Sequence, residues 1–353
     1  MSTPRTLTPR HRNRALLARQ MLLDRVRAPL PRVVERMGGI QAQYAPSAYI
    51  GLWSRVDGFR RDALTRALER RTLIQGTSLR STIHTVSSAD YWPFVIAVQA
   101  SQQAWWLRVV KGQGLDAARM EAAANDARRL LADGPLRAAD LIERLGEAGH
   151  PRESFNGLGL WLPMVRVPPS GTWERRRADL YGDAALWTGP PGRLAEREAV
   201  QAILRRYLAA FGPASVESAA SWAGVPNGVM QEAADSLALR TVRQVDGPNL
   251  LDVPRGPLPD PDTPAPVRML GTWEALLLVH ARGTGVLAED LREAVFHTKN
   301  PHSVNTFLVD GTVAGTWRHE GGRITVQPFQ PLPRRMRQEV DHEADRLRAL
   351  FAQ

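Results

Sequence analysis

Two glutamines, Gln41 and Gln43, stand one residue apart directly after a Gly-Gly pair, in the stretch GGIQAQYAPS over residues 38–47. A glutamine is neither an acid nor a nucleophile, but its amide offers a carbonyl acceptor and two N–H donors. In extended chain, side chains two residues apart share one face. We therefore expect Ile40 and Ala42 to pack inward and both glutamines to face one space. There they could orient a water or set a carbonyl dipole against a developing positive charge. A plain surface loop is the alternative.

Other patterns exclude most familiar chemistry. The chain has no cysteine, which excludes disulfides, thiolate catalysis, iron–sulfur clusters and cysteine-bound zinc. It has no Walker A, dinucleotide-binding, HExxH or EF-hand pattern, and the stretch 157–161 (GLGLW) is expected to be helix packing. His297 and His302 have no third ligand nearby, so we expect no metal site and no cofactor. The only lysines, Lys111 and Lys299, fall in expected loops and are the sole candidates for a Schiff base.

The composition favours an acidic partner. A chain of 353 residues corresponds to about two to three domains. Its formal net charge is +10 and its isoelectric point is near 10.8, which favours a polyanion such as nucleic acid. A GC-rich coding sequence would also enrich arginine. No stretch approaches the roughly 20 apolar residues of a membrane helix and no secretory signal opens the chain, so we expect a cytoplasmic protein.

A helical pattern that occurs three times would position the glutamines. Each copy has a proline after Ala or Gly, then a short helix, then a glycine, at 28–39, 134–149 and 212–226. Each follows a longer amphipathic helix, expected at 14–25, 118–132 and 194–211. Two helices joined by a small turn, followed by a third helix and a hairpin, give the order of a winged helix. A generic helical array is the alternative.

The remaining parts of each winged helix follow along the chain. Third helices are expected at 60–71 in the first copy and 226–238 in the third. The wings are expected at 73–86 with a turn near Gly76, at 170–182, and around Asp246-Gly247. The arginine-rich runs in 60–71 and 170–182 are either solvated faces or contacts to the DNA backbone.

The expected fold is therefore mainly α with β wings: three tandem winged-helix domains plus a small C-terminal β-domain. The expected boundaries are 1–110 for the first winged helix, which carries the glutamines, then 111–190, 191–255 and 256–353. The last region follows a linker rich in Pro and Asp. Its expected parts are a helix-like centre in 268–281, strands in 305–329 with turns at Asp310-Gly311 and Gly321-Gly322, and a helix at 333–351.

Three stretches resemble the AlkZ/YcaQ family of DNA glycosylases, on its AlkZ-like branch. They are GGIQAQYAPSAYIGLWSR (38–55), LRSTIHTVSSADYW (79–92) and FLVDGTVAGTWR (307–318), and the resemblance extends over essentially the whole chain. The catalytic signature of the family is glutamine–aliphatic–glutamine, which Gln41-Ala42-Gln43 matches. A related branch has aspartate at the second polar position, and this chain does not.

The resemblance implies a monofunctional glycosylase that hydrolyses the N-glycosidic bond of N7-alkylated purines in double-stranded DNA. Some substrates of the family carry bulky adducts or interstrand crosslinks, in DNA repair or self-resistance. An N7-alkylpurine is already cationic and leaves readily, so neutral amides could suffice to aim a water and stabilise the sugar cation. We assign Gln43 to the water and Gln41 to polarising the sugar or the water. We expect a monomer that works on the nucleoid, with an open cleft because a crosslinked base cannot leave the duplex.

Further DNA contacts are expected from the hairpin after the first-domain helices and from the C-terminal β-domain. Arg80, Thr82 and His84 are two residues apart and would share a face, either toward DNA or as buried polar contacts. Arg318 is expected to contact DNA, while Trp317 beside it favours core packing. The main alternative function is a winged-helix transcription regulator or drug sensor without catalytic activity, which would use 333–351 as a dimerisation helix.

Overall fold

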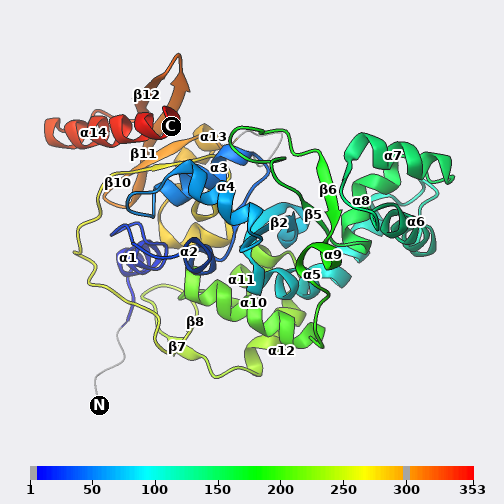
Figure 1. The fold of residues 1–353 in the computed structure, drawn as a ribbon. Helices are drawn as coiled ribbons and strands as arrows, with labels where there is room; N and C mark the ends of the chain where they lie inside the picture. Colours follow the sequence, from blue (N-terminus) through cyan, green and yellow to red (C-terminus); the bar gives the residue numbers. More distant parts are fainter. Residues whose placement is uncertain (1–5, 297–302) are drawn as a thin grey trace.

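The computed structural model of the chain describes residues 6–296 and 303–353, in which groups of helices are followed by short strands (Figure 1). The helices of the first region are α1 (Pro9–Arg19), α2 (Leu30–Met37), α3 (Ala45–Trp53), α4 (Arg61–Glu69) and α5 (Ser88–Val109). Its strands are β1 (Ile40–Gln41), β2 (Leu73–Thr77) and β3 (Ile83–Ser87), with the 3-10 turn η1 (Leu79–Ser81) between β2 and β3.

Two further helical regions follow, each ending in a pair of strands. The first comprises α6 (Ala117–Leu130), β4 (Leu136–Arg137), α7 (Ala138–Glu147), α8 (Glu153–Trp161), β5 (Met164–Arg166), β6 (Leu180–Asp183) and α9 (Ala184–Thr188). The second comprises α10 (Glu196–Phe211), α11 (Val216–Ala223), α12 (Asn227–Asp235), β7 (Arg240–Val242) and β8 (Leu250–Asp252). Figure 1 shows α6, α7 and α8 grouped at one end of the molecule, far from α14.

The C-terminal region forms a four-stranded sheet covered by the last helix. Its elements are β9 (Arg268–Leu270), η2 (Ala275–Leu277), η3 (Val279–Thr284), η4 (Glu289–Leu291), α13 (Arg292–Val295), β10 (Thr306–Val309), β11 (Thr312–Glu320), β12 (Arg323–Pro328) and α14 (Arg334–Phe351). The strand order is β12-β11-β10-β9. The expected turns at 310–311 and 321–322 are confirmed. The helix-like centre expected in 268–281 is wrong, because a strand and short 3-10 turns occupy it.

Local signals account for several helix ends. Thr8 caps α1 by accepting a hydrogen bond from the His11 N–H, and Pro9 opens the helix. The helix expected at 14–25 is therefore shifted: α1 ends at Arg19, and Met21 has a positive φ of 56° that no α-helix accommodates. Gly224 ends α11 in the left-handed conformation, as the repeated proline–helix–glycine pattern predicts.

One six-stranded sheet joins the first two regions, in the order β1-β3-β2-β5-β6-β4. The join between β2 and β5 is made at Gly76, which pairs with Val165. A Cβ at Gly76 would lie 2.8 Å from the Tyr91 ring and 3.0 Å from the Met164 carbonyl oxygen, so only glycine permits this approach. The expected turn near Gly76 is therefore wrong. Gly76 lies inside β2, and the chain reverses at residues 78–82.

The apolar faces of the helices are used inside the chain. Tyr207, Phe211 and Trp222 pack α10 and α11 into the largest core with α5. The apolar face of α14 packs on β9 and β12, with Val340 and Leu347 buried. That face is not available for the dimerisation expected of a regulator. None of the helices in the described ranges is long and apolar enough to cross a membrane.

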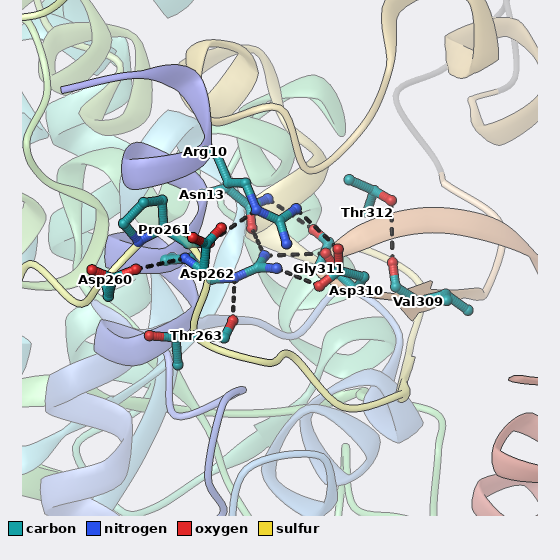
Figure 2. A network of polar contacts seen from close by, with 11 residues as sticks. Arg10, Asn13, Asp260, Pro261, Asp262, Thr263, Val309, Asp310, Gly311 and Thr312 are labelled. Atoms are coloured by element: carbon teal, nitrogen blue, oxygen red, sulfur yellow. Dashed lines mark hydrogen bonds and ion pairs between the residues drawn. The ribbon is translucent and has the colours of Figure 1, made fainter.

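A buried arginine, Arg14, connects α1 to the linker and to the β10–β11 turn through hydrogen bonds. Figure 2 shows the network of polar contacts in this region. Arg14 is fully buried and donates to Thr263 O at 2.7 Å, Asn13 Oδ1 at 2.6 Å and Asp310 O at 3.1 Å. Its guanidinium also forms an ion pair with the Asp310 carboxylate, which Arg10 contacts at 2.9 Å. We call Arg14 with these partners the Arg14 cluster. It fixes segments that are some 250–300 residues apart in the sequence.

Candidate active site

The Gly38-Gly39 pair ends α2 and directs the chain into β1. Gly38 is left-handed with φ 76° and ψ 29°, and Gly39 has φ 83°. A Cβ at Gly39 would also lie 3.1 Å from Val86 Cγ1. The chain then pairs antiparallel with β3, which places Gln41 opposite His84. The extended segment expected after the glycines is thus present, although it is only two residues long.

The two glutamines differ in exposure. Ile40 and Ala42 are buried as expected, at 7% and 1% exposure. Gln41 is also buried, at 5%, whereas Gln43 is exposed. The strand ends at Gln41, so the two-residue alternation does not continue to Gln43. The expectation of one shared environment is therefore wrong: one amide lies inside the protein and the other reaches solvent.

The carbonyl oxygens of both amides are held by donors from the segment after β2. Gln41 Oε1 accepts from Arg80 Nη2 at 3.3 Å, and Gln43 Oε1 accepts from the Ile83 backbone N–H at 3.2 Å. A guanidinium and a backbone N–H can only donate, so these contacts fix which end of each amide faces the protein. Each carbonyl keeps a second lone pair. Within residues 6–296 and 303–353, neither Nε2 donates to a protein atom. The amides are thus oriented but retain hydrogen-bonding capacity.

Arg80 is a partly buried cation without an acidic partner among the described residues. It lies in η1 with a left-handed backbone (φ 54°, ψ 30°), and Ser81 after it also has a positive φ of 58°. Its guanidinium donates to the Trp222 carbonyl as well as to Gln41. Burial lowers the pKa of Arg80 to about 10. In the described part of the chain it forms no ion pair with a carboxylate. We call Arg80, Gln41, His84 and the Trp222 carbonyl the Arg80 cluster.

His84 is a neutral member of this cluster. It is 3% exposed, and burial together with the Arg80 charge lowers its pKa to about 3. Its Nδ1 lies 3.1 Å from Thr82 O, so the N–H is on Nδ1 and donates to that carbonyl. The Thr82 hydroxyl donates to Leu79 O at 3.0 Å. Arg80 is in a turn and His84 in a strand, so the expectation that Arg80, Thr82 and His84 share one strand face is wrong, yet all three gather beside Gln41.

Further residues of the site come from the second region and were missed by the sequence analysis. Arg166 Nη1 donates to Ala42 O at 3.1 Å, and burial lowers the pKa of Arg166. Tyr44, which is 43% exposed, accepts from Arg176 Nη1 at 3.3 Å. The loop between β5 and β6 carries Arg176 with an exposed arginine on either side. The expected wing at 170–182 therefore supplies cations to the glutamine segment, because the shared sheet brings the two together.

The other candidate residues lie elsewhere or are unused here. Trp317 is 2% exposed and donates to Leu270 O at 2.9 Å, which is core packing. Arg318 is exposed on β11, and no hydrogen bond or ion pair of the described residues joins it to the glutamines. Lys111 lies in the exposed turn after α5. Lys299, His297 and His302 lie outside the described residues. Across the ranges that are described, no three His, Asp or Glu side chains gather as a metal-binding group.

Gln41 also borders a small polar cavity behind the site. Gln20, Ser47, Thr272 and Glu274 share its wall. Its volume of about 10 Å³ is enough for about one water and far too small for a nucleobase. The buried side of Gln41 therefore offers no base-binding pocket in this cavity, and the pair is open to solvent only at Gln43.

Comparisons with known proteins match the chain to one family and its fold to a solved structure. A family model described as "DNA glycosylase AlkZ-like" matches residues 34–350. Among solved structures, the chain is similar to the Streptomyces sahachiroi DNA glycosylase AlkZ, with a TM-score of 0.82 and 20% sequence identity over 98% of each chain. No curated protein sequence matches.

Proposed function

Since the family model covers most of it, the chain belongs to the AlkZ-like DNA glycosylase family, and we propose that it releases N7-alkylated purines from double-stranded DNA as a monofunctional enzyme. The observation that carries this proposal is the orientation of the two amides. Gln41 accepts from Arg80 in the turn after β2, Gln43 accepts from Ile83 at the start of β3, and Gln43 lies at an exposed edge that a duplex can reach.

The reaction needs no carboxylate at its centre. An N7-alkylpurine carries a positive charge, so breaking the C1′–N9 bond sends the bonding electron pair to the base and neutralises it. Water then forms the new bond to C1′ and releases one proton to solvent. The protein must hold that water and stabilise the sugar cation that develops. Preorganised amide dipoles do this, and removing one such group typically costs about 100- to 1,000-fold in rate.

We assign the exposed amide to the water and the buried amide to the sugar. The free lone pair of Gln43 Oε1 can accept a hydrogen bond from the attacking water, and its Nε2 can donate one to a DNA oxygen. Gln41 is buried, Arg80 donates to its carbonyl oxygen, and the remaining lone pair of that oxygen would face the sugar cation. Arg80 and the Ile83 N–H would then act by positioning these amides.

The arginines around the pair would hold the DNA backbone. Arg80 lacks a carboxylate, and Arg176 stands in an exposed run of three arginines next to Tyr44. Guanidinium groups match phosphate geometry and remain charged at neutral pH. We propose that Arg80 and Arg176 bind phosphates on either side of the lesion. Thr82 and His84 would support the turn that carries Arg80, and Arg318 would contact DNA farther from the reacting sugar.

We further propose that residues 1–110, 111–190 and 191–255 are three winged helices, with 256–353 as a β-domain. The element orders support this reading: α6-β4-α7-α8-β5-β6 and α10-α11-α12-β7-β8 both end with a third helix and two strands. The shared six-stranded sheet makes the first two a single unit. A monomer would act on chromosomal DNA in the cytoplasm, since the apolar face of α14 is already covered.

An open site also supports bulky lesions as substrates. Gln43 and Tyr44 are exposed, so an N7 substituent that projects into the groove would not meet an enclosed wall there. We propose that large adducts and interstrand crosslinks are accepted. Duplexes with N7 groups of increasing size should then be cleaved at rates within about ten-fold of each other. A steep loss beyond the methyl group would contradict an open site.

Base release from a duplex containing one N7-methylguanine tests the function. Alkali should cut the strand at an abasic site after incubation with the protein. The Gln41→Ala/Gln43→Ala variant should lose at least about 100-fold in rate, whereas Gln113→Ala, an exposed glutamine in the turn after α5, should not. Borohydride should trap no covalent adduct. Undiminished base release by the double variant would contradict the assignment of the two amides.

A further inference from the structure

A pocket of about 550 Å³ shares Arg80 with the Gln41 site. It lies between α5, which contributes Trp105 and Arg108, and the turn from α11 to α12 at Gly224. Its volume falls within the roughly 300–1,000 Å³ of small-molecule sites. We call it the Trp105 pocket. Nothing in the proposed reaction uses it.

The wall at Trp105 is an uncovered aromatic surface. Trp105 is 44% exposed, although it lies inside the long helix α5 and not at its end. Its neighbour Trp106 is packed instead, with its indole so close to Gly157 that a Cβ there would lie 2.3 Å from Trp106 Nε1. One of two adjacent tryptophans is thus left open to the pocket. An exposed indole can take a flat ring by stacking.

The charge of the pocket is positive. Arg80 and Arg108 both line it, and in the described ranges neither forms an ion pair with a carboxylate. The Gly224 turn presses on the backbone of Arg80, since a Cβ at Gly224 would lie 3.1 Å from Arg80 Cα. The backbone of Arg80 is therefore fixed by this packing, and its guanidinium is held by the hydrogen bonds to the Trp222 carbonyl and to Gln41. Two guanidinium groups beside an indole match the two parts of a nucleotide, a phosphate and a base.

We propose, resting on the glycosylase function above, that the Trp105 pocket binds one unstacked nucleotide of the substrate DNA. Its base would stack on Trp105, and its phosphate would lie between Arg80 and Arg108. In a paired duplex both faces of a base are covered by neighbours, so only a nucleotide that has left the stack can use this surface. Because Arg80 also holds Gln41, the bound nucleotide is a near neighbour of the one that reacts.

Equilibrium binding to undamaged DNA tests this without requiring base release. The probes are a fully paired duplex and the same duplex with a single-nucleotide bulge. Trp105→Ala should weaken binding to the bulged duplex by about 5- to 100-fold, and binding to the paired duplex by less than about two-fold. Trp105→Phe should keep most of the affinity, because phenylalanine also stacks. Trp187→Ala, the same change at a tryptophan that packs against Arg71, should have no effect.

A second variant tests the phosphate contact. Arg108→Gln should lower the slope of log affinity against log salt by about 0.9 on the bulged duplex. Unchanged binding of Trp105→Ala to the bulged duplex, or equal losses on both duplexes, would overturn the proposal. The Gln41→Ala/Gln43→Ala variant should keep the bulge preference while losing base release. If base release is absent from the native protein but the bulge preference holds, the proposed function fails and the pocket stands.

Discussion

The Arg14 cluster and the Arg80 cluster each hold a guanidinium group inside the fold, Arg14 fully buried and Arg80 partly buried, and their neighbours differ in charge. Arg14 donates to three oxygens and pairs with the Asp310 carboxylate, so its charge is compensated within the fold. Arg80 donates only to neutral carbonyls, of Trp222 and Gln41, and its neighbour His84 is held neutral. Arg14 is enclosed and has its counter-ion, whereas Arg80 is partly buried and, among the described residues, has none.

This difference separates an arginine that stabilises the fold from one that serves a ligand. A buried charge that loses its partner is costly, which is why the pairing of Arg14 matters to folding. A partly buried charge without a carboxylate partner, such as Arg80, points to a ligand instead, and our proposal is that this ligand is a DNA phosphate. Arg108 and Arg176 share this property with Arg80: among the described residues, neither forms an ion pair with a carboxylate, and both lie near the site.

Removing the counter-ion of Arg14 should have the largest effect. Asp310→Asn keeps a residue that tolerates the positive φ of 47° but leaves the Arg14 guanidinium without its carboxylate. We expect a loss of about 2–3 kcal/mol in the free energy of unfolding, measured by urea titration, reduced from the full cost because Asp310 is half exposed. Asp57→Asn, at an exposed pair with Arg27, should change the free energy of unfolding far less, because solvent screens an exposed ion pair. Equal losses of unfolding free energy in the two variants would contradict the structural role assigned to the Arg14–Asp310 ion pair.

Acid should reveal the neutral histidine of the Arg80 cluster. The pKa of His84 falls from 6.5 to about 3 on folding, so the unfolded chain binds more protons than the folded one between these values. Stability is therefore present above pH 6.5 and is lost as the pH falls toward 3, by about 2 kcal/mol between pH 7 and pH 5. His84→Gln should reduce this loss, while His342→Gln on exposed α14 should not. An unchanged pH slope in His84→Gln would show that His84 is not held neutral.

Removing Arg80 should affect DNA rather than folding. Arg80→Gln takes away a partly buried charge that has no carboxylate, so we expect the free energy of unfolding to change by less than about 1 kcal/mol. Base release should fall by about ten-fold or more, because a charge-assisted contact to phosphate is worth about 1.5–3 kcal/mol. Arg129→Gln on exposed α6 supplies the matched control. A stability loss as large as that of Asp310→Asn would place Arg80 with the structural arginines.

The exposed arginines should show the smallest effect, and only as a dependence on salt. Arg176→Gln should lower the slope of log affinity against log salt by about 0.9 for double-stranded DNA, with an affinity loss of a few-fold at physiological salt. Arg335→Gln, equally exposed on α14, should leave the slope unchanged. A slope that does not respond to Arg176→Gln would remove the β5–β6 loop from the DNA interface.

Sequence reasoning succeeded where the signal was local. The glycine at the end of α2, the turns at 310–311 and 321–322, and the three proline–helix–glycine segments each depend on the φ preferences of a few neighbouring residues. The position of Gln41 after such a glycine also followed from these preferences. These local preferences correctly predicted where the segment with Gln41 and Gln43 begins and that it starts as extended chain.

It failed where a distant contact or an unusual backbone decides the outcome. Arg80 and Ser81 both adopt positive φ, which no alternation rule anticipates for residues other than glycine. The contacts of Arg166 with Ala42 and of Arg176 with Tyr44 depend on a distant strand pairing, which joins Gly76 to Val165. The long helix α5, which supplies Trp105, contains Pro93 and has no clear apolar stripe. Its sequence pattern therefore does not predict a helix there.

The missing side chain of Gly76 has a consequence for how this enzyme can vary. Any larger residue there would push β5 away from β2, and the loop with Arg176 would drift from the glutamines. The first two regions of the chain therefore cannot be exchanged separately between relatives unless the pairing of β2 with β5 is also preserved. A chimaera that takes both together should remain active, and one that splits them should bind DNA but leave the lesion in place.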